Sequence, residues 1–351
     1  MSRDVLLELR EVRKDYPVGR SLFGDKQLLH AVAGVSFQVF PGETLALVGE
    51  SGCGKSTTGR LILNLEKLNG GEILFKGRST ASYSAEDWQE YRRNVQVVFQ
   101  DSHSSLNPRK TLRHILVSAM LCSQRFSDSL TGRERREVAE KEALSLLRSV
   151  GLTPPEQFLE KYPNELSGGQ RQRIGIARAL STQPDLIVAD EPVSSLDVSV
   201  KAQVLKLLET LRDEKEVAFL FVSHELPVVR SIAHRVAVMY LGKIVEIGEV
   251  ADVFSRRLHP YTEALISASP VPDPEATRKK KRIVLPGGVP SAIDPPKGCP
   301  FHPRCFHAQD ICRTEAPPLQ EEAAGHHVAC HFAAERLQNL PVAQRTMPHN
   351  T

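Results

Sequence analysis

The feature that most constrains the fold is the segment Gly49–Thr57, GESGCGKST. It follows a short apolar stretch, Thr44–Val48, that we expect to be a strand, and it precedes a predicted helix that continues to about Leu65. Glycines in such a loop let backbone N–H groups turn inward around phosphate oxygens, and the N-terminus of the following helix adds a field that favours an anion. The order of strand, loop and helix therefore predicts a P-loop that binds a nucleoside triphosphate.

The P-loop pattern also predicts roles for single side chains. Lys55 is expected to reach the β- and γ-phosphates, and the Ser56 hydroxyl to ligate Mg²⁺. Cys53 is interpreted as a spacer, with an oxidisable thiol beside the N–H donors as the alternative. The residues expected around the triphosphate are Gly49, Glu50, Ser51, Gly52, Cys53, Gly54, Lys55, Ser56 and Thr57.

A second segment, Asp185–Asp190, places an apolar strand ahead of two consecutive carboxylates. Asp190 suits the coordination shell of the metal, and Glu191 suits polarising the attacking water, a role worth about 10² to 10⁴-fold in rate. Alone, this could be an acidic loop after a buried strand. Together with the P-loop it predicts hydrolysis of the bound nucleotide.

The rest of the chain predicts an α/β fold. Strand-like segments alternate with helical ones, which favours a mostly parallel sheet flanked by helices and interrupted by a helical insertion over about 101–182. We also expect an antiparallel β subdomain. In the helical insertion, one helix carries an apolar stripe. The stripe consists of Ala139, Ala143, Leu146, Leu147 and Val150. The segment 235–247 is predicted to be a hairpin that turns at Leu241 and Gly242.

The segments predicted to be strands are 5–10, 31–40, 44–48, 72–75, 94–100, 185–190 and 217–223, and a further helix is predicted over 198–213.

Composition excludes some classes of protein. The net charge of +3 on 351 residues is too small to indicate a nucleic-acid partner. No run of eighteen apolar residues occurs, and the first residues do not resemble a signal peptide, so we expect the chain to stay in the cytosol. Near residue 270 proline and charge become frequent, and the basic run Arg278–Arg282 is interpreted as part of a solvated linker.

A third motif, LSGGQRQR at Leu166–Arg173, completes an ordered set with the P-loop, DLIVADEP and VSHE. With this set the chain resembles the nucleotide-binding subunits of ABC transporters, whose signature Leu166–Gln170 matches without departure. The resemblance implies that Gln100 links the γ-phosphate and Mg²⁺ to the helical insertion, and that His224 contacts the γ-phosphate. It also implies that Tyr16 stacks on adenine, although an aromatic residue before Pro17 could equally end a strand.

In that family the signature acts on a nucleotide held by another subunit. Ser167, Gly168, Gly169 and Gln170 precede or begin a helix, where free N–H groups and the positive helix end form a second anion site. The resemblance implies that this site closes over ATP bound to a partner. It also implies that the loop Ser194–Asp197 faces the partner, with Asp197 among the residues of the ATP site. ATP would then hold a dimer together until it is hydrolysed.

Three further segments resemble the importers of dipeptides and oligopeptides. They are Ser105–Arg109, the tetrapeptide His259–Thr262 before an amphipathic helix, and Gly298–Cys305 with the cysteines beyond it. The resemblance implies two transmembrane permease subunits and a second ATPase subunit, for which it favours a paralogue over a second copy of this chain. It also implies an indirect link to a solute-binding protein, and it places the chain at the cytoplasmic face of the membrane. Relatives carry nickel complexes, glutathione, opines or sugar-containing oligomers, so the solute stays open.

Four cysteines crowd into the last fifth of the chain: Cys299, Cys305, Cys312 and Cys330. In a reducing cytosol such a group indicates metal ligation before disulfides. Their irregular spacing favours a [4Fe–4S] cluster, with Zn²⁺ or free thiols in a packed cap as alternatives. The other possible ligands are His302, His326, His327 and His331.

We therefore expect a nucleotide-binding domain over about 1–255 and a C-terminal extension over about 256–340. Two rival functions are a soluble ABC ATPase acting on DNA or ribosomes and an export ATPase. The first usually carries two nucleotide domains or a long coiled coil, and the second a fused membrane domain, and the sequence shows neither. The prediction is therefore a peripheral ATPase, with ATP and Mg²⁺ as cofactors, that drives import.

Overall fold

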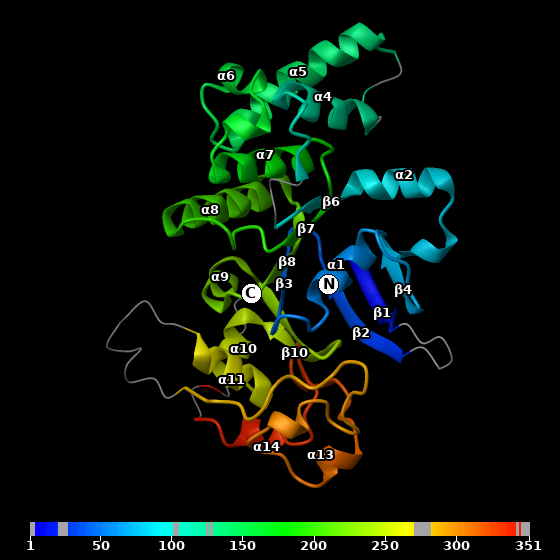
Figure 1. The fold of residues 1–351 in the computed structure, drawn as a ribbon, viewed down its shortest axis with the longest axis vertical. Coiled ribbons are helices and arrows are strands. Elements are labelled where there is room, and N and C mark those ends of the chain that lie inside the picture. Colours follow the sequence, from blue (N-terminus) through cyan, green and yellow to red (C-terminus); the bar gives the residue numbers. More distant parts are fainter. Residues whose placement is uncertain are drawn as a thin grey trace. The chain divides into compact units, whose positions relative to one another are not determined.

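The computed structural model describes residues 4–19, 27–100, 105–123, 126, 129–269, 282–341 and 344 (Figure 1). Their contacts divide the chain into two compact units. The first unit comprises Met1–Phe40, Thr44–Ala81 and Phe221–Thr351, and the second comprises Pro41–Glu43 and Ser82–Leu220.

The first unit contains an antiparallel sheet with the strand order β2-β1-β4-β5. Its strands are β1 (Leu7–Val18), β2 (Gln27–Val39), β4 (Gly70–Phe75) and β5 (Arg78–Ser79). Strands β1 and β2 are longer than predicted. The alternation of apolar residues fades after Arg10, but pairing with β2 continues as far as Val18 opposite Gln27. Cross-strand hydrogen bonds therefore extend β1 beyond its apolar pattern.

A second sheet in this unit has the neighbouring strands β11-β12-β10-β9-β3. They are β11 (Gln320–Ala323), β12 (His326–Val328), β10 (Lys243–Glu249), β9 (Arg235–Tyr240) and β3 (Thr44–Val48). Strand β3 pairs parallel with β9, and β9 pairs antiparallel with β10 across the turn at Leu241 and Gly242, which confirms the predicted hairpin. Strands β11 and β12 had no apolar pattern and were not predicted, yet they extend this sheet.

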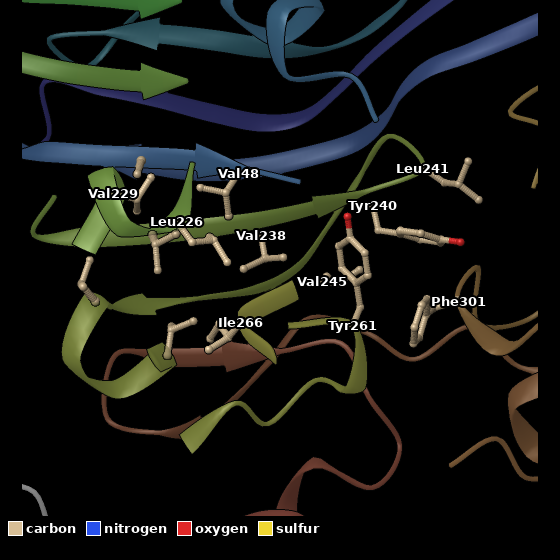
Figure 2. Close-up of a cluster of buried hydrophobic side chains, with 14 of the residues drawn as sticks. Val48, Leu226, Val229, Val238, Tyr240, Leu241, Val245, Tyr261, Ile266 and Phe301 are labelled. Atoms are coloured by element: carbon tan, nitrogen blue, oxygen red, sulfur yellow. The ribbon is translucent and has the colours of Figure 1, made fainter. Parts of the chain in front are cut away.

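The helices of the first unit are α1 (Lys55–Ile62), α9 (Leu226–Ile232), α10 (Val250–Arg256), α11 (Pro260–Ala268), α13 (Ile311–Thr314) and α14 (Ala333–Gln338). Of these, α9, α10, α11 and α13 contribute side chains to one buried core. Figure 2 shows part of the core, in which Val48 and Val238 lie near Leu226 and Val229, and Phe301 lies beside Tyr261. Because Phe301 comes from the C-terminal extension, the extension shares its core with the sheet that carries the P-loop.

The second unit contains most of the helical insertion. Strands β6 (Val95–Val98) and β7 (Leu186–Asp190) pair in parallel, and β8 (Ala218–Ser223) begins in this unit. In helix α5 (Gly132–Ser149), the predicted stripe is confirmed at Ala139, Ala143 and Leu147, which are fully buried, whereas Leu146 is half-buried. The helices are α2 (Ala85–Asn94), α4 (Leu112–Cys122), α5 (Gly132–Ser149), α6 (Pro155–Leu159), α7 (Gly168–Leu180) and α8 (Val198–Lys215).

Part of the predicted linker is packed against the core of the first unit. The backbone N–H of His30 donates to the carbonyl oxygen of Ala292 at 2.9 Å, and Leu285 and Ala292 are partly buried against the core. Residues 270–281, which include all of the basic run except Arg282, lie outside the described residues. Among the helices of the described ranges, none has the length and apolar character needed to cross a membrane.

Candidate nucleotide-binding site

The first unit confirms the predicted order of strand, loop and helix around Gly49–Thr57. Strand β3 is buried along its length, and α1 begins at Lys55 directly after the loop. Gly49 and Gly54 have φ angles of 152° and 109°, which L side chains rarely adopt. A Cβ atom on either would lie 2.2 Å from a backbone oxygen, that of Met239 or Ala31 respectively. Only glycine therefore fits both positions.

Lys55 is held inside the loop. Its Nζ atom donates to the carbonyl oxygen of Gly49 at 2.8 Å and to that of Glu50 at 3.0 Å, and it lies 3.7 Å from the Sγ atom of Cys53. The positive charge is thus fixed at the loop before a phosphate arrives. Burial raises the pKa of the Cys53 thiol although Lys55 opposes the shift. The thiol therefore stays protonated, which favours the spacer interpretation over an oxidisable thiolate.

Two residues outside the predicted nucleotide-binding residues hold Glu50. The backbone N–H of Glu50 donates to the Tyr261 hydroxyl at 2.8 Å. The Glu50 carboxylate accepts two hydrogen bonds from the Arg304 guanidinium, at 2.7 and 3.1 Å, and this contact raises the pKa of Arg304. Both partners lie within segments noted only as marks of the importer family. Nothing in their local pattern points to a loop more than 200 residues away.

Tyr16 lies in β1, opposite Leu29 of β2, and its side chain is half-buried. The ammonium group of Lys14 lies 4.9 Å from the centre of the Tyr16 ring, a cation–π distance. Next to it, the Nδ1 atom of His30 lies 2.7 Å from the Asp15 carboxylate. The position is an ordinary part of a strand, and stacking on adenine stays a prediction.

The second unit brings Gln100 and Glu191 together. The Nε2 atom of Gln100 donates to the Oε2 atom of Glu191 at 2.8 Å. Strands β6 and β7 are parallel neighbours, with Val98 opposite Ala189, so the residues that follow them emerge at the same edge of the sheet. Glu191 has a φ of 47°, a left-handed conformation that turns the chain sharply after Asp190.

The signature forms the start of helix α7. The Ser167 hydroxyl accepts the backbone N–H of Gln170 at 3.3 Å, and the Gln170 side chain accepts the N–H of Ser167 at 3.0 Å, so the two form a capping box. A Cβ atom on Gly169 would lie 2.5 Å from the side chain of Val200 in α8, whereas one on Gly168 would meet open space. Small residues thus leave one side of this positive helix end open, as an anion site requires.

The remaining predicted residues fall in both units. Ser56 lies in the first turn of α1, and His224 follows β8 in the first unit, where it is exposed. Asp190 is the last residue of β7 in the second unit. Asp197 precedes α8 and is exposed, as is Val198 with 86% of its surface accessible. In the loop Ser194–Asp197, Ser195 and Asp197 are exposed, whereas Ser194 and Leu196 are half-buried.

The four clustered cysteines converge on one narrow cavity of the first unit. Cys299, Cys305, Cys312 and Cys330 all line it, with His302 and His331 beside them. Burial raises the pKa values of Cys299, Cys305 and Cys330 to about 11 each, which favours neutral thiols. In the part of the chain that the structure describes, no three Cys, His, Asp or Glu side chains form a group that could hold a metal ion. The iron–sulfur cluster thus stays a prediction.

One of the alternative metal ligands is engaged elsewhere. His326 is fully buried in β12, where its Nε2 atom lies 2.8 Å from the Oε1 atom of Glu246. Glu246 also accepts the backbone N–H groups of Leu258 and His259, each at 3.0 Å. His326 therefore helps to join β12 to β10 and the start of α11.

Known protein families match two parts of the chain. Residues 32–194 match the family model for the ABC transporter, and residues 245–312 match the model for the oligopeptide/dipeptide transporter C-terminal region. The chain is 50% identical over 94% of its length to the oligopeptide transport ATP-binding protein AppF of Bacillus subtilis, of which it covers 98%. It is 46% identical to the dipeptide transport ATP-binding protein DppF of Haemophilus influenzae, over 93% of this chain and 96% of that protein.

A solved structure shows the same fold. It is the dimeric post-hydrolysis state of the ATP-binding cassette MJ0796 with ADP and Pi, which has a TM-score of 0.59 and 29% identity, and it covers 70% of this chain and 99% of that one. The motifs, the fold and these relatives define an ATPase of the ABC class. The chain belongs to the family of ABC transporter ATP-binding proteins, in the branch with the oligopeptide/dipeptide transporter C-terminal region.

Proposed function

We propose that this ATPase powers the import of dipeptides, oligopeptides or a related solute through a membrane channel. The hydrogen bond between Gln100 and Glu191 at the ends of two parallel strands carries the hydrolytic part of the proposal, because it places a carboxylate where a water can be polarised. Relatives named for oligopeptide and dipeptide transport support the solute class. A nickel complex, glutathione or an opine is the alternative cargo.

The chemistry is divided among the named side chains. Lys55 supplies positive charge for the β- and γ-phosphates, and Glu191 orients the attacking water. The hard oxygen donors of Ser56, Gln100 and Asp190 suit Mg²⁺, which would neutralise phosphate charge when bound. His224 and the signature N-terminus of a partner would complete the surroundings of the γ-phosphate, and Tyr16 would stack on the adenine.

The assignment of Glu191 is tested by Glu191→Gln. The amide cannot take up a proton from water, so the ATPase rate should fall by about 10² to 10⁴-fold while ATP binding persists. The variant should also remain a closed dimer with ATP, seen as a shift in size-exclusion chromatography. The exposed Glu216→Gln serves as the control and should keep the parental rate. Turnover of Glu191→Gln near the parental rate would show that another group is the base.

We further propose that the chain works in a complex. A second ATPase subunit, which we expect to be a paralogue and not a second copy, would contact the partly exposed loop Ser194–Asp197 and the open start of α7. Two permease subunits would hold the pair at the cytoplasmic face of the membrane, and a solute-binding protein would deliver the cargo on the other side. Co-purification from the native membrane, followed by mass spectrometry, identifies which ATPase chain is paired with this one.

For the four cysteines we propose a [4Fe–4S] cluster, with Zn²⁺ as the alternative. The proposal is supported by the four cysteines that line one cavity. A metal bound there would displace the protons of these thiols and would cross-link a loop-rich segment with few helices and strands of its own. Anaerobically purified protein should contain about four iron and four sulfide per chain. Zinc alone in that sample would exclude the cluster.

A further inference from the structure

The C-terminal extension reaches the nucleotide site through Glu50 of the P-loop. Arg304, which is only 7% exposed, donates two hydrogen bonds to the Glu50 carboxylate, one to each oxygen. Such a bidentate pair fixes the orientation of the two groups relative to each other. Arg304 belongs to the short 3₁₀ turn His302–Arg304 and is followed directly by Cys305. The pair therefore joins the P-loop to the cysteine-bearing segment.

Tyr261 provides a second connection. Its hydroxyl accepts the backbone N–H of Glu50, and its ring is fully buried in the core. The ring centre lies 4.7 Å from that of Tyr240 and 5.4 Å from that of Phe301, and Figure 2 shows the three rings gathered at one end of the core cluster. Aromatic contacts of this kind hold a ring in one orientation, so the hydroxyl is fixed where the loop needs an acceptor.

Every polar group of Glu50 is engaged. Its N–H is bound to Tyr261, its carboxylate to Arg304, and its carbonyl oxygen accepts from Lys55 Nζ at 3.0 Å and from the backbone N–H of Cys53 at 3.3 Å. Glu50 is thus the residue at which the extension meets the lysine that binds phosphate. A displacement of Glu50 would move the carbonyl group that holds Lys55.

We propose that Arg304 and Tyr261 are positioning residues for ATP binding, and that through Glu50 they hold the P-loop and Lys55 in the geometry that receives the phosphates. The inference rests on the assignment of Gly49–Thr57 as the ATP-binding loop. Neither residue touches the nucleotide in this scheme. Their effect on ATP comes from the conformation of Glu50, so it depends on Glu50 being able to make both contacts.

The test measures the dissociation constant for ATP by isothermal titration calorimetry, and kcat and KM in a steady-state ATPase assay. Arg304→Gln should raise the dissociation constant and KM about 10-fold, within the range typical of coupling between sites, and leave kcat at saturating ATP within about twofold. Arg304→Lys should be only partly rescued, because an ammonium group cannot bind both carboxylate oxygens in the same way. Tyr261→Phe, which removes only the acceptor oxygen, should weaken binding in the same direction.

A double-mutant cycle shows whether the effect passes through Glu50. In a Glu50→Gln background, Arg304→Gln should add little further loss of ATP affinity. The matched control is Arg336→Gln, which breaks the 2.6 Å ion pair with Glu263 in the same extension without touching the P-loop. It should lower thermal stability but leave ATP affinity unchanged.

Two outcomes would overturn the inference: parental ATP affinity in Arg304→Gln and Tyr261→Phe, or an equal loss in Arg336→Gln. If Arg304→Gln does not fold, Tyr261→Phe and Glu50→Gln decide instead. Lys55→Ala separates this inference from the proposed function. Parental ATP binding by Lys55→Ala would refute the assignment of the nucleotide site itself. If Lys55→Ala loses ATP binding while Arg304→Gln and Tyr261→Phe keep parental affinity, only the positioning role is refuted.

Discussion

At the scale of single residues, Gly54 shows how tightly the P-loop backbone is enclosed. Its φ of 109° disfavours any side chain, and a Cβ atom would also lie 2.2 Å from the carbonyl oxygen of Ala31. Gly54→Ala should therefore displace the start of α1 and abolish measurable ATP binding, with a loss of stability above about 1 kcal/mol. Equilibrium binding of a fluorescent ATP analogue and urea unfolding measure the two effects.

Gly52 offers a matched control within the same loop. It has a φ of 81°, but a Cβ atom there would meet no atom within 4 Å. Gly52→Ala therefore adds only the backbone strain and should retain more ATP affinity than Gly54→Ala. Equal losses in the two variants would show that strain, and not the contact with Ala31, makes glycine necessary.

Residue patterns revealed some of the site and not the rest. Glu191 was predicted from the carboxylates after an apolar strand, and Gln100 from the resemblance to ABC subunits. The structure joins them because each follows a strand of the same parallel pair. The contacts of Tyr261 and Arg304 with Glu50 could not be predicted, since no local periodicity encodes an ion pair across 254 positions of sequence. Motifs carry chemistry that recurs in many chains, whereas long-range partners depend on how one particular chain packs.

At the scale of elements, helix α7 depends on its N-cap. Ser167→Ala removes the acceptor for the Gln170 N–H and should cost about 1 kcal/mol in unfolding free energy. Thr131→Ala removes the corresponding cap of α5, where the Thr131 hydroxyl accepts the backbone N–H of Glu134, and should cost a similar amount. Because only α7 carries the signature, only Ser167→Ala should also reduce the ATPase rate. Equal rates in both variants would contradict a catalytic role for the start of α7.

Helix α11 has a cap that is sensitive to pH. The Nδ1 atom of the buried His259 accepts the backbone N–H of Tyr261 at 3.0 Å, and burial lowers the pKa of His259 to about 4 from its ordinary value near 6.5. Between these two values the unfolded chain binds a proton that the folded chain does not. Stability should therefore fall as the pH falls from about 6.5 to about 4, by about 2 kcal/mol at pH 5.

The measurement is the unfolding free energy at pH 7 and pH 5 for the parent and for His259→Asn. Asparagine can still accept a hydrogen bond at an N-cap but has no proton to bind in this range. The parent should lose about 2 kcal/mol more than the variant between the two pH values. An identical loss in both proteins would show that other groups cause the acid sensitivity.

Elements were predictable where apolar residues recur at regular spacing. Strand β3 has the predicted bounds, and the apolar stripe of α5 is buried at the predicted face. Strands β11 and β12 were missed because Gln320–Ala323 and His326–Val328 are short and mostly polar. They are strands because β12 pairs with β10 and β11 pairs with β12. Their conformation is set by the neighbouring strand and not by their own sequence.

At the scale of the whole molecule, the C-terminal extension and the P-loop sheet share one core. Substitution of Phe301 tests whether this shared core stabilises both. Phe301 is 1% exposed and contacts the rings of Tyr240 and Tyr261. Phe301→Ala should cost about 3 to 5 kcal/mol in unfolding free energy, because it leaves a cavity between them. Phe306→Ala, at a side chain that is 42% exposed, should change stability by less than about 1 kcal/mol.

Urea titrations of both variants provide the comparison. A cost below about 1 kcal/mol for Phe301→Ala would mean that the extension is an appendage that can loosen without disturbing the sheet. The fold class could be predicted from the sequence at this scale, because the alternation of strands and helices around a P-loop admits few architectures. The shared core could not, since it depends on a proline-rich segment that has no periodicity.

The ion pair between Glu50 and Arg304 also sets an order of events during protein synthesis. The ribosome adds the P-loop residues first, and Arg304, which forms the ion pair with Glu50, is added about 250 residues later. At about 5 to 20 residues per second, this is a delay of tens of seconds. A chain released before residue 304 contains every nucleotide motif and yet lacks this fastening. If Arg304 positions the P-loop as proposed, such a chain should bind ATP about 10-fold more weakly than the finished subunit, and would compete poorly with it for its partners.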